Sequence, residues 1–264
     1  GGAGADSVGT NKDGVFLGGQ GPDYVDVLRN GLIDGGKGKD SAGRQYNGYF
    51  IGADGHDSLS FLHNGTYSGW RHDDRITGAH YQGVFAAGPG NDFSAEQTGG
   101  TTRGGAGFDR VEQMSGDAVF NGGPLRDTVV GLVGNASFRG NKGNDVVEDQ
   151  LGESARFYGG PGHDAAERMT DRARFEGGDD RDAVAWLHDL AVFTGGPKAD
   201  SVGRQLGGIF AGNKGPDSVG DPDGFYGLAA GLANGGPGTD SVNICAGGTG
   251  TADRMEIETT TTCP

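Results

Sequence analysis

The sequence predicts an all-β protein, a right-handed parallel β-solenoid of about 14 turns of 17–18 residues with two flat sheets. The first reason is a repeat: an aspartate at the end of a glycine-rich stretch, as in GGAGADSV at residues 1–8, returns every 17 to 19 residues up to Asp217 and again at Asp240. Self-similarity at a constant period indicates stacked repeats. The second reason is composition, because 57 of 264 residues are glycine and only 33% are hydrophobic. Such a chain suits thin turns that bury a few side chains against their neighbours.

The first expected strand of each turn follows the repeat aspartate. The aspartates are Asp6, Asp23, Asp40, Asp57, Asp74, Asp92, Asp109, Asp127, Asp145, Asp164, Asp182, Asp200, Asp217 and Asp240. Two residues after nearly every one stands a small apolar residue, such as Val8, Val25 or Val111, and Ser94 is the polar exception. Because side chains alternate along a strand, this apolar row faces inward and the variable residue before it faces outward.

The second expected strand carries an aromatic row. Phe16, Phe50, Phe138 and Phe157 are examples, and Ile33 and Thr102 take the same place in two turns. Two positions earlier the residue is almost always Gly or Ala, which leaves room for the ring. Stacked turns would place successive rings about one strand spacing apart, ~4.8 Å. We therefore expect a valine ladder and a phenylalanine ladder inside the solenoid.

Two corners join the strands of each turn. One is the glycine-rich corner with the aspartate, and the other is variable and polar, with Asn-Gly or Asp-Gly turn signals. Apolar residues support the polar corner intermittently; they are Leu28, Leu62, Met114, Leu132, Met169 and Leu187. His63 and His80, 17 residues apart, are expected to stack on this edge.

We expect solenoid repeats over residues 1–245 and a C-terminal cap over 246–264. The turn at 69–86 is irregular, because Trp70 and Arg71 replace its glycine pattern, and the turn at 212–234 is longer. No cap is visible before the first repeat. A bare solenoid end exposes strand edges, so we expect a preceding segment or self-association through this end.

Charge and composition disfavour several function classes. The net charge of −15 opposes binding to nucleic acid and to anionic membranes and suits cations. No apolar run approaches the ~18 residues of a membrane-spanning helix. We find no nucleophile with an adjacent base and no Gly-x-Ser-x-Gly, so an enzyme is not expected.

The glycine corner resembles a known motif. The pattern GGxGxDxUx, with U apolar, is best kept in GGAGADSV, GGQGPDYV, GGKGKDSA, GGAGFDRV, GGPGHDAA and GGPGTDSV. It resembles the calcium-binding nonapeptide of RTX, or haemolysin-type, repeat proteins, secreted bacterial proteins with a parallel β-roll. The resemblance implies Ca²⁺ held between successive corners by Asp carboxylates and backbone carbonyls. Because only one corner of each turn carries the motif, one row of several ions is expected. The expected ligands are Asp6, Asp23, Asp40, Asp57, Asp92, Asp109, Asp145, Asp164, Asp217 and Asp240.

The remaining corners have lost part of the motif, as in GWRHDD and GGPLRD, which puts sites at Asp74, Asp127, Asp182 and Asp200 in doubt. Physical chemistry also favours a cation. Carboxylates stacked about 5 Å apart raise each other's pKa, and calcium accepts carboxylate and carbonyl oxygens together. The alternative is that each aspartate caps backbone N–H groups of its own corner.

The two cysteines bear on location. Cys245 and Cys263 are 18 residues apart, about one turn, so they are predicted to be equivalent in stacked turns and to form a disulfide. A disulfide implies an oxidising compartment, which agrees with millimolar calcium outside cells. The predicted location is therefore extracellular or at the cell surface.

The expected function is a secreted, calcium-binding structural or adhesive rod within a larger extracellular or filamentous assembly. One alternative is a binding face for an extended ligand, ice or polysaccharide. The exposed aromatics that would serve a sugar are Tyr24, Trp70, Phe93 and Trp186, although scattered surface aromatics usually have no such role. Another alternative is the targeting module of a secreted enzyme.

Overall fold

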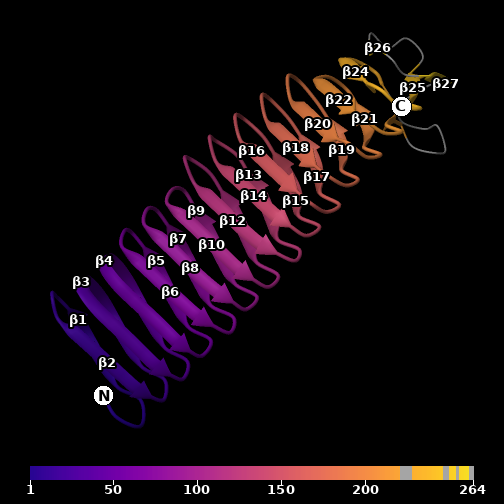
Figure 1. Ribbon diagram of the computed structural model, residues 1–264. Helices are drawn as coiled ribbons and strands as arrows, with labels where there is room; N and C mark the ends of the chain where they lie inside the picture. The colour runs from indigo at the N-terminus through magenta and orange to yellow at the C-terminus, as the bar shows by residue number, and fades with distance from the viewer. Residues whose placement is uncertain (221–227, 246–249, 254–255, 262–264) are drawn as a thin grey trace. The chain divides into compact units, whose positions relative to one another are not determined.

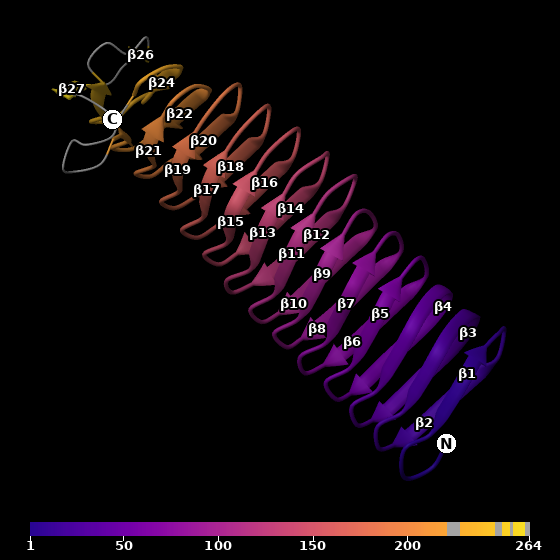
Figure 2. The same cartoon turned by 180° about the vertical axis from the view of Figure 1, so that it is seen from behind.

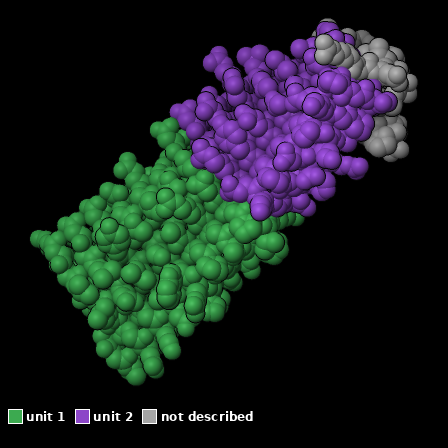
Figure 3. Space-filling model, viewed as in Figure 1, with its two compact units in different colours: residues 1–129 green, residues 130–264 purple. Residues whose placement is uncertain are grey.

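The computed structural model describes residues 1–220, 228–245, 250–253 and 256–261, and within these ranges the regular elements are all β-strands. The chain divides into two compact units, Gly1–Val129 and Val130–Pro264, which are coloured separately in Figure 3. Each unit is a parallel β-solenoid, so the predicted fold class is confirmed.

In the first unit, strands one turn apart pair in parallel and lie side by side in Figure 1. Its strands are β1 (Ser7–Asn11), β2 (Val15–Gln20), β3 (Tyr24–Lys37), β4 (Ser41–Asp54), β5 (Ser58–Leu62), β6 (Thr66–Arg71), β7 (Arg75–His80), β8 (Val84–Pro89), β9 (Phe93–Gln97), β10 (Thr101–Ala106), β11 (Arg110–Met114) and β12 (Val119–Pro124). The register follows the sequence repeat, because Val8 pairs with Val25, which pairs with Ala42.

The second unit repeats this plan, as the rear view in Figure 2 also shows. Strand β13 (Thr128–Leu132) crosses the division between the units. The later strands are β14 (Ser137–Lys142), β15 (Val146–Leu151), β16 (Arg156–Gly160), β17 (Ala165–Met169), β18 (Arg174–Gly178), β19 (Ala183–Leu187), β20 (Val192–Gly196), β21 (Ser201–Gln205), β22 (Ile209–Asn213), β23 (Ser218–Val219), β24 (Leu232–Asn234), β25 (Ser241–Cys245), β26 (Thr251–Asp253) and β27 (Glu256–Thr261). Phe157 pairs with Phe175, and Val184 with Val202.

The two predicted ladders form the core of each unit. Val25, Val111 and Val184 of the valine ladder are buried, and so are the aromatic members of the phenylalanine ladder from Phe50 to Phe210. In the first unit the ring centroids of Phe50 and Tyr67 lie 4.8 Å apart. In the second unit the spacings run from 4.4 Å, for Phe157 and Phe175, to 5.3 Å, for Phe193 and Phe210. The rings therefore stack at the spacing that the turns impose.

The length of a turn depends on its polar corner. Corners that end in glycine, such as the one at Gly100, are one residue shorter than corners that end in alanine, such as the one at Ala173. The alanine corners close on themselves: the Ala173 N–H donates to the Thr170 carbonyl at 3.2 Å, and Asp171 between them has φ 58°. One further residue enters through bulges in β7 and in β15, which explains why those turns are longer than their corners predict.

Buried amide side chains hydrogen-bond to polar corners that end in glycine, and sequence reasoning missed them. Gln45 lies in the row of Leu62 and Met114, is fully buried, and donates from Nε2 to the carbonyls of Gly48 at 2.9 Å and Thr66 at 2.8 Å. The same pattern of two donated bonds recurs at Asn11, Gln97 and Gln205. A glutamine or asparagine among leucines at this row was the available signal. These side chains donate hydrogen bonds to carbonyls that a polar corner ending in glycine leaves without a backbone donor.

The expected stacking of His63 on His80 is wrong. The extra residue in β7 places His80 opposite Leu62, inside the core, where burial lowers its pKa to about 4. His63 instead stacks outside between Tyr46 and Tyr81, at 4.6 Å and 4.9 Å between ring centroids. A one-residue bulge exchanges the inward and outward faces of a strand.

Candidate functional site

The repeat aspartates form one buried row in each unit. Asp6, in the first turn, is partly exposed, and every later aspartate of the row is at most 3% exposed. Asp74, Asp127, Asp182 and Asp200, whose corners have lost glycines, are buried as deeply as the others. The eroded corners therefore place the carboxylate in the same surroundings as the intact ones.

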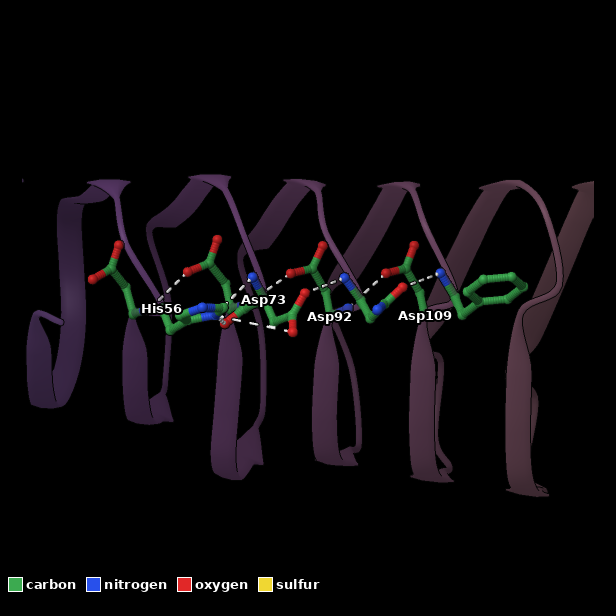
Figure 4. A network of polar contacts seen from close by, with 8 residues as sticks. His56, Asp73, Asp92 and Asp109 are labelled. Atoms are coloured by element: carbon green, nitrogen blue, oxygen red, sulfur yellow. Dashed lines mark hydrogen bonds and ion pairs between the residues drawn. The ribbon is translucent and has the colours of Figure 1, made fainter. Parts of the chain in front are cut away.

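One oxygen of each carboxylate replaces a backbone acceptor. The N–H of Asp92 donates to Oδ1 of Asp109 at 2.8 Å, and the N–H of Asp74 donates to Oδ1 of Asp92 at 2.7 Å. Figure 4 shows Asp92 and Asp109 on consecutive turns with their carboxylates aligned. The same bond recurs from Asp6 to Asp109 in the first unit, and from Asp145 to Asp217 in the second. The aspartates thus cap backbone N–H groups of the preceding turn, and Asp6 also accepts from the Gly2 N–H of its own corner at 3.0 Å.

The other oxygen, Oδ2, has no such partner at most positions. Within the described residues, the buried Oδ2 atoms that accept no hydrogen bond belong to Asp23, Asp40, Asp57, Asp74, Asp92, Asp109, Asp164, Asp182, Asp200, Asp217 and Asp240. Each unsatisfied buried carboxylate oxygen is costly, because it has lost its water. A proton or a cation would remove this cost.

The first residue of nearly every corner is a glycine that makes room for Oδ2, and Ala87 takes its place in the Asp92 corner. A Cβ on Gly104 would lie 2.1 Å from Oδ2 of Asp109, and one on Gly18 would lie 2.1 Å from Oδ2 of Asp23. Close approach to the carboxylate therefore favours glycine at the first position of the motif. Carbonyl oxygens line the same space, since the Gly35 oxygen lies 2.4 Å from the hypothetical Cβ of Gly18.

Burial raises the pKa of most aspartates in the row. Desolvation is the largest cause; the N–H of the preceding aspartate opposes it, and neighbouring carboxylates add to it. The pKa is raised to about 8 for Asp74, Asp92 and Asp164, to about 7 for Asp57, Asp182 and Asp200, and to about 6 for Asp109 and Asp217. Without a cation, part of the row is protonated at neutral pH.

The donor set fits a hard cation. It consists of carboxylate and carbonyl oxygens, which are calcium ligands. Within the part of the chain that the structure describes, no three His, Cys, Asp or Glu side chains gather as a metal-binding group. An ion on the row would therefore draw on carboxylates of neighbouring turns and on backbone carbonyls for the rest of its ligands.

In some turns a second polar row lies beside the first, formed by the residue directly before the repeat aspartate. The Nδ1 atom of His56 accepts from the N–H of Asp73 at 3.2 Å, and Oδ1 of Asp73 accepts from the N–H of Asn91 at 2.8 Å. Figure 4 shows His56 and Asp73 along this row. In the second unit, Asn144 and His163 make the same contacts. Sequence reasoning missed this row, although a side-chain acceptor directly before the aspartate was its signal.

The cysteine pair and the predicted stacking aromatics are the remaining predicted groups. Cys245 ends β25, and the parallel register sets Thr261 of β27 opposite it. Cys263 lies outside the described residues, so the Cys245–Cys263 disulfide stays a prediction. Among the predicted stacking residues, Trp70 is 58% exposed and Tyr24 is 43% exposed.

Comparison with known proteins identifies no relative: no family model matches the sequence, no curated protein matches it, and no solved structure matches the chain. Among the residues that the structure describes, no helix is long and apolar enough to cross a membrane. The RTX resemblance therefore rests on the corner motif and the solenoid.

Proposed function

We propose that this protein is a calcium-binding structural solenoid, in which Ca²⁺ neutralises the buried aspartate row. The observation that carries the proposal is the series of buried Oδ2 atoms without a hydrogen-bond donor on consecutive turns. The ten aspartates in intact corners are the proposed ligands. The equal burial of Asp74, Asp127, Asp182 and Asp200 supports the same role for them.

Calcium is preferred to other cations because of the donor chemistry. The described part of the row presents oxygens and no sulfur or ring nitrogen, and Ca²⁺ takes six to eight oxygens in a flexible geometry. Mg²⁺ demands a near-ideal octahedron and keeps its water, which a buried corner does not supply. When bound, the ion would supply charge neutralisation that the fold otherwise lacks.

The proposed setting is extracellular, where calcium is abundant, and the proposed role is structural or adhesive, within a larger assembly. The regularity of the two units supports this role, because most buried polar side chains serve the backbone of a neighbouring turn. A binding face for an extended saccharide is the second candidate function, and one exposed groove favours it, as argued below.

Calorimetric titration of the EGTA-treated protein with CaCl₂ tests the proposal, with MgCl₂ as the control ion. We expect several Ca²⁺ per chain and a rise in melting temperature that Mg²⁺ does not reproduce. An unchanged melting temperature and no heat of binding would overturn calcium binding.

An asparagine variant separates calcium from the capping alternative. Asp74→Asn/Asp92→Asn/Asp109→Asn keeps an oxygen that accepts the backbone N–H but removes the charge. If Ca²⁺ holds the row, this variant binds fewer ions and loses calcium-dependent stability. If a proton holds it, the variant is as stable as the parent or more stable in EGTA and equal to it in calcium. Glu176→Gln, on an exposed residue outside the row, is the matched control.

A further inference from the structure

An open groove of about 520 Å³ lies on the outside of the first unit, beside the irregular turn at 69–86. Its lining includes Ser68, Trp70, Ala86, Gly88, Arg103 and Gly105. Its lining also includes Ala87 and Gly104, the first residues of the Asp92 and Asp109 corners, so the groove lies beside the aspartate row. The lining comes from three consecutive turns, so the repeat itself sets the spacing of its walls.

The groove exists because large and small residues alternate across turns. Trp70 stands where the preceding turn has Ala53 and the following turns have Gly88 and Gly105. In the adjacent row, Ala86 pairs with Arg103. An indole and a guanidinium thus rise on either side of a floor made of glycine and alanine. The other turns of the first unit place no tryptophan at this position.

The tryptophan is held there against backbone preference. Trp70 has φ 86°, in the left-handed region that its glycine counterparts Gly19 and Gly36 occupy without strain. His72, two residues later, has φ 72°. The indole is 58% exposed, and the Arg71 guanidinium carbon lies 5.3 Å from its ring centroid. A strained backbone that presents an exposed aromatic ring is a reason to look for a ligand.

The charge of the groove opposes that of the chain. The net charge is −15, yet the charged residues that line the groove are Arg71 and Arg103. Neither arginine forms an ion pair with a carboxylate among the described residues. An arginine fork recognises a carboxylate with two parallel hydrogen bonds, and an indole face packs against flat, partly apolar rings.

We propose that this groove binds an acidic saccharide, with one sugar ring against Trp70 and its carboxylate on Arg103. The floor suits the apolar face of a sugar, and the groove is open to solvent. A nucleic acid fits less well, because it needs an extended basic surface. The proposal deepens the second candidate function and does not depend on calcium.

Tryptophan fluorescence reports binding directly. The chain has two tryptophans, so Trp186→Phe leaves Trp70 as the only tryptophan, and its emission is excited selectively over that of tyrosine. This parent is titrated with trigalacturonate, and trigalactose is the uncharged control. We expect saturable quenching by the acid that weakens as salt increases, and at least tenfold weaker binding of the neutral sugar.

Variants locate the site. Arg103→Ala is expected to weaken trigalacturonate binding at least tenfold, and Arg103→Lys less, because lysine keeps the charge but not the fork. Arg156→Ala, an exposed arginine of the second unit, is the matched control and leaves binding unchanged. Trp70→Gly lacks the reporter, so its loss of binding is measured by calorimetry, and its fold by circular dichroism.

Four results would overturn the proposal: no binding of the acid, equal binding of trigalactose, tighter binding of benzoate, or tighter binding of single-stranded DNA. The titrations are run both in EGTA and in excess CaCl₂, wherever circular dichroism shows the folded solenoid. If saccharide binding is absent, the heats of calcium binding are unaffected, and if calcium binding is absent, the Trp70 titration is unaffected. The two proposals can therefore fail separately.

Discussion

Close packing at single residues explains the corner motif. In the corners that begin with glycine, Oδ2 of the aspartate lies closer to that glycine than a Cβ would allow, and Ala87 takes this position only in the Asp92 corner. The second glycine has a positive φ, as at Gly105 with 108°. Glycine is therefore favoured at two adjacent positions for two different reasons.

Gly104→Ala tests this packing. The added Cβ would lie 2.1 Å from the buried Asp109 carboxylate, so a shift of the turn is unavoidable. We expect a loss of about 1–3 kcal/mol in the free energy of unfolding, measured by urea denaturation. Gly9→Ala is the control, because a Cβ there meets nothing within 4 Å. Equal effects of the two substitutions would contradict the packing argument.

Phe157→Ala tests the aromatic ladder. Phe157 is fully buried, with ring centroids 4.9 Å and 4.4 Å away on its two sides. Removing the ring should cost about 3–5 kcal/mol in unfolding free energy. Tyr158→Ala, on the adjacent outward residue, serves as the control and should cost less than half as much. A Phe157→Ala loss below that of Tyr158→Ala would refute the role of the ladder.

At the scale of elements, the buried residue behind the polar corner differs between corners that end in alanine and corners that end in glycine. Where the polar corner ends in alanine it closes with its own backbone bond, and an apolar residue such as Met114 fills the row behind it. Where the corner ends in glycine, an amide such as Gln97 often takes that place and supplies the bonds. In the described turns, the amides thus stand behind corners that end in glycine, and Leu28 and Leu62 show that such a corner also accepts an apolar residue.

Gln97→Leu tests the match. The substitution keeps the volume but leaves the Gly100 and Val119 carbonyls without the donated bonds. We expect a loss of about 1–3 kcal/mol in unfolding free energy. Met114→Gln, the reverse change behind a polar corner that ends in alanine, should also lower the free energy of unfolding, because it buries an amide away from a polar corner that ends in glycine. A stabilising Gln97→Leu would show that the amide bonds contribute nothing.

For the whole chain, the main electrostatic feature is the concentration of carboxylates in a protein of net charge −15. Among them, the row aspartates are inside rather than at the surface. The metal-free protein must therefore desolvate charge or bind protons along the row. This makes stability depend on pH in the direction opposite to that of salt-bridged carboxylates.

The melting temperature in EGTA should fall as pH rises. The folded pKa of Asp74, Asp92 and Asp164 is raised to about 8, whereas an unfolded aspartate titrates near about 4. Folded protein then binds more protons than unfolded protein between these values, so the contribution is fully present below about pH 4 and is lost by about pH 8. Melting curves in EGTA from pH 5 to pH 9 measure this, and the same series in CaCl₂ should fall less steeply. A melting temperature that rises with pH in EGTA would contradict the raised pKa values.

The sequence by itself determined the period, the two inward ladders and the aspartate row. Each depends on a residue type that recurs once per turn, and stacking turns in parallel register brings equal positions together. The positions of Val25, Phe157 and Asp92 could be predicted for this reason. The tertiary structure decided which atoms meet. It showed that Asp92 caps the preceding turn, that Gln45 lies in the core, and that a bulge separates His80 from His63. It also showed the groove between Trp70 and Arg103, because a hollow depends on side chains from three turns at once, and no single repeat records that relation.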